Sequence, residues 1–356
     1  MAVRLRPYGL AFLSSLCIMI LELVASRLVA RHVGASLTVW TSVIGIMLAG
    51  ICLGNVLGGR LADRVEPSQG VGPLFALGTF LTLACLWVNA YAGVIPDVES
   101  LPWLRTILVV IVDFLIPTTV LGMVGPVVAK MAVEQSANSG SAVGNVYFSG
   151  AVGSIVGTFV AGFYLIYLAT TTTIVNIVGA GLAFLAVLML QGRMAKVVGV
   201  VTVALLALGS IAPVAEMIPP IGVNIGSTPI NPLILGGHFA SLVLAILGLI
   251  QLKKAWQPSE VAFADLDDDS FMGVKPTLRD LALLSFIASM AFMALEMVAG
   301  RLVTRHLGSS IYGWTSVIGV LLGGLSIGNW LGGQIANKVT KEIGRASCRE
   351  RVLWYV

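Results

Sequence analysis

Charged residues are scarce in this chain of 356 residues. Asp, Glu, Lys and Arg make up 11% of it, against 57% hydrophobic residues, and the mean hydropathy is +0.97. A soluble domain has too little core to hide that much apolar surface. The composition therefore excludes a soluble enzyme and a nucleic-acid-binding protein.

Cysteine is also rare, and the sequence shows no nucleotide-binding pattern. Cys17, Cys52 and Cys85 lie in apolar segments and Cys348 near the C-terminus. No pair has metal-ligand spacing, so we expect neither a metal site nor a disulfide framework. There is no strand followed by a glycine-rich loop and no βαβ pattern. We therefore expect no catalytic residues and no cofactor in this chain.

Apolar runs of about 20 residues recur along the sequence, which is the length needed to cross a bilayer core of roughly 30 Å. We predict an all-α, polytopic membrane protein, with the lipid bilayer as its surroundings and about ten transmembrane helices. The predicted spans are residues 8–31, 39–62, 71–93, 104–133, 142–168, 172–190, 195–213, 232–252, 278–303 and 311–337.

The distribution of Lys and Arg predicts the orientation. With the N-terminus inside, most of these residues fall at cytoplasmic ends of spans, and few fall at outer ends. The basic N-terminal segment leads straight into an apolar helix without a small-residue cleavage site, so we interpret it as a retained first span. We expect a multi-pass protein of the plasma (inner) membrane with a cytoplasmic N-terminus.

One stretch of the chain occurs twice. Residues 22–62 read ELVASRLVARHVGASLTVWTSVIGIMLAGICLGNVLGGRLA, and residues 296–336 read EMVAGRLVTRHLGSSIYGWTSVIGVLLGGLSIGNWLGGQIA. The offset is a constant 274 residues without a gap, and 24 of the 41 positions are identical. Because the identities include charged residues inside apolar segments, we interpret the pair as two copies of one membrane hairpin.

The two copies point the same way across the membrane, because they begin at the first and ninth spans and an even number of spans separates their starts. We predict a parallel internal repeat of a two-helix hairpin. Residues 1–252 would form a first transmembrane unit, residues 253–277 a cytoplasmic linker, and residues 278–341 the start of a second transmembrane unit.

Residues 342–356 interrupt the apolar pattern with a charged run that begins EIGRASCRERV. A back-translation of this run resembles a common sequencing-adapter read. We therefore expect the tail to be non-native and the native sequence to stop near Lys341, with the gene cut short there.

Each copy carries acidic and basic residues in its first helix. Glu22 lies deep in the first span, where a carboxylate costs roughly 2.5–3.5 kcal/mol on insertion scales. Arg27 and Arg31 share one helix face, but Glu22 and Arg27 are roughly 140° apart around the helix, so we expect Glu22 to meet another helix. Two interpretations stay open: a site that handles protons or cations, and a structural pair that holds the copies in register. The second copy repeats the arrangement at Glu296, Arg301 and Arg305.

The second helix of each copy carries glycines at four-residue spacing, which lets another helix backbone approach closely. An asparagine beside each stripe is placed to hydrogen-bond across that contact, so tight packing is the expected role. Trp40 and Trp314, which begin these helices, fit anchors at the outer interface. The stripes consist of Gly50, Gly54, Asn55 and Gly58 in the first copy and Gly324, Gly328, Asn329 and Gly332 in the second.

Two other polar features stand out. Asp113 is an intramembrane acid of the fourth span, where Pro117 and Pro126 are expected to kink or interrupt the helix. GGRLADR, at residues 58–64, resembles the loop signature of major facilitator transporters through its pair Asp63 and Arg64. The second copy reads GGQIANK and lacks the acid.

Three stretches together resemble the membrane region of membrane-bound spermidine synthase-like proteins, in which a facilitator-like membrane part is fused to a spermidine synthase domain. They are the doubled hairpin, IPTTVLGMVGP at residues 116–126, and VGNVYFSGAVGSIVGTFVAGFYL at residues 143–165. The resemblance implies that a cytosolic aminopropyltransferase domain, which would bind decarboxylated S-adenosylmethionine and a polyamine, follows in the intact protein. That C-terminal domain is missing here, so this chain alone is not an enzyme.

Two functions follow as expectations. The first is the membrane module of a spermidine synthase-like protein, whose intact form would be an aminopropyltransferase. The alternative is a transporter-like module, of the major facilitator type, for a small cation, polyamine or metabolite. A pure scaffold also stays open. No nucleic acid is expected as a partner.

Overall fold

The computed structural model describes residues 2–96, 101–211, 214, 217, 223–225, 228–257, 278–307 and 311–353. Within these residues, ten helical spans are long and apolar enough to cross a membrane, and they coincide with the ten predicted spans. The prediction of an all-α polytopic membrane protein is therefore confirmed. The main helices are α1 (Ala2–Val33), α2 (Leu37–Arg64), α3 (Pro67–Tyr91), α4 (Pro102–Gly122), α5 (Val124–Glu134), α6 (Ser139–Phe159), α8 (Thr171–Met189), α9 (Arg193–Ser210), α11 (Pro232–Ala255), α12 (Leu278–Leu307) and α13 (Ile311–Leu353).

Short polar side chains begin several of these helices. Ser36, Thr170 and Asn231 each accept a hydrogen bond from a backbone N–H of the first turn of α2, α8 and α11, respectively. Pro232 occupies the first position of α11, where its missing N–H is not needed. Gly34 follows the end of α1 with φ of +78°, a conformation that favours glycine.

The fourth span is interrupted, as its prolines predict. α4 ends at Gly122 and α5 begins at Val124, with Met123 between them. Pro117 lies inside α4, whereas Pro126 lies in the first turn of α5, where a proline is tolerated. The fifth span is also irregular, because α6 leads into the π-helical segment η2 (Val160–Leu165) and the short α7 (Ile166–Leu168).

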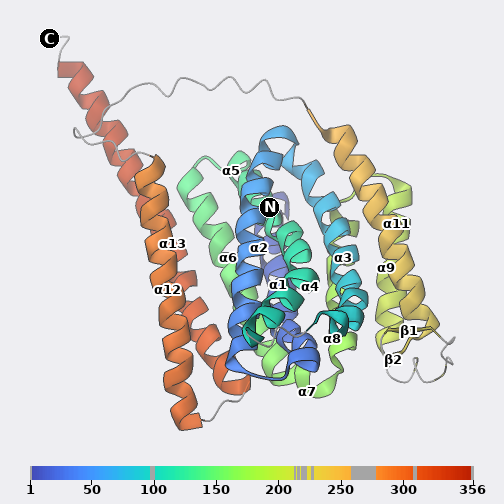
Figure 1. The fold of residues 1–356 in the computed structure, drawn as a ribbon. Helices are drawn as coiled ribbons and strands as arrows, with labels where there is room; N and C mark the ends of the chain where they lie inside the picture. Colours follow the sequence, from blue (N-terminus) through green and yellow to red (C-terminus); the bar gives the residue numbers. More distant parts are fainter. Residues whose placement is uncertain are drawn as a thin grey trace.

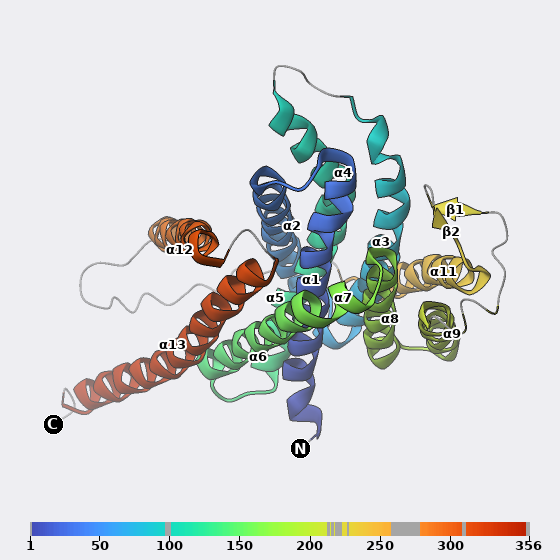
Figure 2. The same cartoon turned by 90° about the horizontal axis from the view of Figure 1, so that it is seen from below.

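α1 lies at the centre of the bundle and packs against α6, α8, α5, α2 and α4 (Figure 1). Leu21 and Val29 of α1 are fully buried there. α9 and α11 lie on one side of this centre, while α12 and α13 lie on the opposite side (Figure 2). α13 packs along α6, whereas α12 packs mainly against α13 and leaves most of its side chains exposed. The second hairpin therefore joins the bundle chiefly through α13.

The connections meet the predictions in part. The segment between the seventh and eighth spans contains a small antiparallel hairpin of β1 (Asn224–Ile225) and β2 (Thr228–Pro229). Most of the predicted linker, residues 258–277, lies outside the described residues. The backbone of α13 continues as a helix to Leu353, and residues 354–356 lie outside the described residues. The non-native origin of residues 342–356 stays a prediction.

Candidate functional site

Glu22 of α1 and Glu296 of α12 lie close enough for their charges to interact. They occupy the same position in the two copies, 274 residues apart. Glu296 is only 7% exposed, and Glu22 is partly buried. The group that the structure places within electrostatic range of Glu22 is thus a second carboxylate on another helix. Direct contact of Glu22 with a residue of another helix stays a prediction. Two ionised carboxylates near each other in a medium of low dielectric would repel each other.

A second pair of equivalent residues also meets. The rings of Trp40 and Trp314 stack with centroids 6.0 Å apart and planes 10° from parallel. Both pairs join a residue to its own counterpart in the other copy. Trp314 is 5% exposed, so its ring is buried against the first copy, and its role as an anchor at the outer interface stays a prediction.

The four predicted arginines differ in their contacts and exposure. Arg27 donates from Nη1 to the carbonyl oxygen of Ile166, at 3.3 Å, and so ties α1 to the irregular end of the fifth span. The side chains of Arg31, Arg301 and Arg305 are exposed. The structure thus places these basic side chains toward the surface.

Asp113 belongs to a separate polar cluster. Its side chain is 1% exposed, and its Oδ2 accepts a hydrogen bond of 2.6 Å from Nδ2 of Asn89 on α3. The same Asn89 nitrogen lies 3.5 Å from the carbonyl oxygen of Leu28 on α1, and the thiol of Cys85 lies within electrostatic range. Asp113 therefore has the partner that the sequence did not reveal, and the cluster joins α1, α3 and α4.

A third polar cluster was missed by the sequence analysis. Trp87 of α3 donates from Nε1 to Nδ1 of His238 on α11, at 2.8 Å. Since Nδ1 accepts this bond, Nε2 carries the ring proton and donates to Oδ1 of Asn176 on α8, at 3.0 Å. Both His238 and Asn176 are buried. The signal in the sequence was the presence of Asn176 and His238 within apolar spans.

The first glycine stripe is packed as predicted. A Cβ placed at Gly54 would lie 2.8 Å from the Cα of Gly122, and one at Gly58 would lie 2.7 Å from the Cα of Met123. The contact is reciprocal, since a Cβ at Gly122 would lie 2.8 Å from the Cα of Ile51. α2 and the junction of α4 with α5 therefore touch through their backbones, a contact that only glycine permits.

The second stripe is open. A Cβ at Gly324, Gly328 or Gly332 would meet nothing within 4 Å. α13 instead uses another face, where a Cβ at Gly333 would lie 2.9 Å from the Cα of Gly144 on α6. Asn55 has an exposed side chain beside the packed stripe, and its Oδ1 lies 3.7 Å from the place that a Cβ at Gly125 of α5 would take. A hydrogen bond of Asn55 across the helix contact stays a prediction.

Contacts around Asp63 and Arg64 link the C-terminal end of α2 to α5 and to the end of α11. Lys130 of α5 donates to the carbonyl oxygen of Ala62 at 2.6 Å and lies 3.7 Å from Oδ1 of Asp63. The guanidinium of Arg64 lies 5.1 Å from the ring centroid of Trp256, which follows α11. Such exposed contacts stabilise by less than about 1 kcal/mol each, so they fix geometry more than stability.

Glu66, which precedes α3, accepts side-chain hydrogen bonds from Ser68 at 2.5 Å and from Gln69 at 2.7 Å. These bonds hold the pKa of its exposed carboxyl below the usual range.

Comparison with protein-family models and with curated protein sequences finds no match for the chain. Among the described residues, no group of three His, Cys, Asp or Glu side chains could hold a metal ion. We take the equivalent acids Glu22 and Glu296, which lie within electrostatic range of each other, as the candidate site.

Proposed function

We propose that the chain is a transport module for a small organic cation, such as a polyamine, with Glu22 and Glu296 as its binding groups. The placement of these equivalent carboxylates within electrostatic range of each other, on two helices long and apolar enough to cross a membrane, is the observation that supports the proposal. Two carboxylates repel each other strongly in a medium of low dielectric, and a proton or a cation between them relieves this repulsion. A molecule with two ammonium groups suits the pair, because each carboxylate can bind one of them.

The packing of the two hairpins supports movement at this site. The first hairpin is held by backbone contacts between α2 and α4, whereas most side chains of α12 are exposed. A shift of the second hairpin about its contact with α6 would change the separation of the two carboxylates. Transporters built from repeats alternate access by such a motion of one repeat against the other, around a site near the middle of the bilayer.

A second candidate is the membrane part of a spermidine synthase-like protein, which the resemblance of the doubled hairpin and of residues 116–126 and 143–165 favours. The structure gives these residues a shared role in packing, because Gly122 contacts α2 and Gly153 of α6 contacts the backbone of Phe12 on α1. The residues that the intact gene encodes beyond Lys341 test this candidate. A downstream domain without a nucleotide-binding βαβ unit would contradict it.

We further propose that the protein resides in the plasma membrane with its N-terminus in the cytoplasm, which the Lys and Arg distribution supports. The cluster of Asp63, Arg64 and Lys130 would then face the cytoplasm. Cysteine accessibility to a membrane-impermeant thiol reagent tests this orientation. A cysteine introduced at Lys254 should be protected in intact cells, and labelling there would contradict the orientation.

Uptake into proteoliposomes tests the transport proposal. Uptake of labelled spermidine by the wild-type chain is compared with that of Glu22→Gln, Glu296→Gln and the double variant. Each single variant should reduce uptake about tenfold or more, because it removes one charged hydrogen-bonding partner. The double variant should reduce uptake little further, because the two residues act as one unit.

Glu134→Gln, at the exposed end of α5, is the matched control. Equal uptake by all variants would identify the pair as a structural contact.

A further inference from the structure

Asp113 of α4 is a buried acid outside the proposed cation site. Its side chain is 1% exposed, and its Oδ2 accepts the hydrogen bond of 2.6 Å from Nδ2 of Asn89. Its other oxygen, Oδ1, is buried and has no hydrogen-bond partner among the described residues. Native structures rarely leave a buried polar atom unpaired, so Oδ1 is a candidate binding atom for a small ligand.

The surroundings of Asp113 do not supply a positive charge. The thiol of Cys85 on α3 lies within electrostatic range, but it donates to the carbonyl oxygen of Thr82 at 2.8 Å. Arg105 of α4 itself is two helical turns away, about 12 Å along the axis. The ionisable side chains of the described helices packed against α4 form neither a hydrogen bond nor an ion pair with Asp113; they are Arg6, Glu22, Arg27, Arg31 and His32 of α1, Arg60, Asp63 and Arg64 of α2, and Lys130 and Glu134 of α5.

This environment suits a proton better than a metal ion. Nδ2 of Asn89 approaches both Oδ2 of Asp113 and the carbonyl oxygen of Leu28, the latter at 3.5 Å, so an N–H donor already serves these two oxygens. One oxygen remains, whereas hard metal cations take about six or more oxygen ligands. A buried carboxylate without a cation is costly, and a proton on Oδ1 removes its charge.

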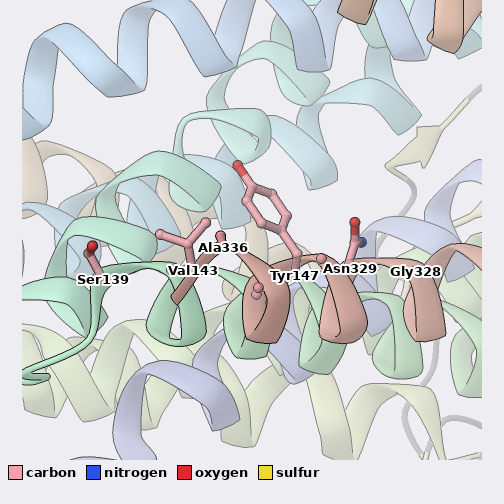
Figure 3. Close-up of a pocket in the computed structure, with 10 residues that line it drawn as sticks. Ser139, Val143, Tyr147, Gly328, Asn329 and Ala336 are labelled. Atoms are coloured by element: carbon pink, nitrogen blue, oxygen red, sulfur yellow. The ribbon is translucent and has the colours of Figure 1, made fainter. Parts of the chain in front are cut away.

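A groove of about 470 Å³ between α6 and α13 lacks such a group. None of the ten residues that line it is an acid, and the side chains of Tyr147 and Asn329 lie on the same side of the two helices (Figure 3). Among the acids that the structure describes, Asp113 is the one with a buried oxygen that has no partner.

Asn89 connects Asp113 to the helix that carries Glu22. The Leu28 carbonyl that its amide approaches belongs to α1, and Glu22 lies six residues earlier, about 9 Å along the helix. A cation bound at Glu22 would stabilise the negative charge of an ionised Asp113, and a proton on Asp113 would remove that attraction. Because coupling between two sites is reciprocal, each ligand weakens the binding of the other.

We propose that Asp113 binds the proton that the module exchanges for its organic cation. This inference rests on the proposed transport function and assigns the second ligand of the exchange to the contact of α1, α3 and α4. The carboxylate takes up a proton to become a neutral acid, and it releases the same proton when the cation binds. No covalent step is involved.

Infrared spectroscopy of the full chain in lipid nanodiscs tests whether Asp113 holds a proton. The double variant Glu22→Gln, Glu296→Gln removes the acids of the proposed cation site. At neutral pH it should still show the carbonyl stretch of a neutral carboxyl, and adding Asp113→Asn should abolish this band. The asparagine keeps an oxygen that accepts from Asn89, so this variant should fold. In the wild type, aspartate labelled with ¹³C in its carboxyl should shift the same band without any substitution.

Spermidine uptake driven by a proton gradient tests the exchange. Proteoliposomes with an acidic interior take up labelled spermidine while K⁺ and valinomycin clamp the membrane potential. For one proton exchanged per spermidine, a tenfold proton gradient should raise accumulation about tenfold. Asp113→Asn should lose this rise. Asp63→Asn is the matched control, because Asp63 is an exposed acid beside Lys130, and it should keep the rise.

The two measurements separate the proton site from the transport function. Absence of the neutral carboxyl band, or its survival in Asp113→Asn, would overturn the proton site. Accumulation that ignores the gradient in the wild type, or a response that survives in Asp113→Asn, would overturn the exchange. If the wild type takes up no spermidine at all, the transport proposal fails and the exchange with it, while the infrared band still decides whether Asp113 binds a proton.

Discussion

Alanine substitutions at Gly54 and Gly328 should have opposite effects, although the two glycines occupy the same position in the two copies. A Cβ at Gly54 would lie 2.8 Å from the Cα of Gly122, closer than real Cβ atoms approach a neighbour, so α2 and α4 must move apart. A Cβ at Gly328 would meet nothing within 4 Å. Overpacking of this kind costs about 1–3 kcal/mol. Alanine also favours a helix over glycine by about 1 kcal/mol, and this gain is common to both variants.

The difference between the two variants is therefore the overpacking cost itself, about 1–3 kcal/mol in the free energy of unfolding. Thermal unfolding in detergent, followed by dye labelling of the buried thiols of Cys17 and Cys85, measures it. Gly54→Ala should lower Tm relative to the wild type, and Gly328→Ala should leave it unchanged or raise it slightly. Equal Tm values for the two variants, or a lower Tm for Gly328→Ala, would refute the reasoning that only the first stripe is packed.

Three further variants test the polar contacts. Asn89→Leu should lower the free energy of unfolding by about 1.5–3 kcal/mol, because it removes the donor to the buried Asp113, and denaturant titration measures the loss. Trp87→Phe should cost about 0.5–1.5 kcal/mol in the same titration, because Nδ1 of His238 loses its donor. The pKa of Glu66 is lowered in the folded chain, so its contribution to stability is present above the unfolded pKa and disappears as the pH falls through the folded pKa. Glu66→Gln should flatten that part of a plot of Tm against pH, and an unchanged slope would contradict the assignment.

The spans and the duplicated hairpin could be predicted from the sequence, because the spans follow from the length of apolar runs and the duplication from repeated residues. Apolar length alone decides whether a helix can cross the bilayer, and the described helices match the predicted spans. Close packing at Gly50, Gly54 and Gly58 followed from their spacing, since four-residue intervals place small residues on one helix face.

The partners of individual polar residues could not be predicted, because they depend on how each helix is rotated and which helices are neighbours. Asn89 and Asp113 are 24 residues apart in the chain, and Trp87 and His238 are 151 residues apart. Nothing in either local sequence indicates these pairings. Likewise, the sequence did not indicate that Glu296, the counterpart of Glu22, would be the charge within electrostatic range of it, because this depends on how the two hairpins pack.

Contact between equivalent residues of the two hairpins is the basis of the proposed site, and cysteine cross-linking measures it most directly. With Cys52 and Cys348 replaced by Ser, the pair Trp40→Cys and Trp314→Cys should be joined rapidly by a short bismaleimide in membranes, since the two rings stack at 6.0 Å. The control pair Trp40→Cys and Val320→Cys should react slowly, because Val320 is 73% exposed, whereas Trp314 is 5% exposed in its contact with Trp40. Rapid cross-linking of the first pair alone is the predicted result. Equal rates for both pairs, or no cross-link for the first, would contradict the meeting of the two copies.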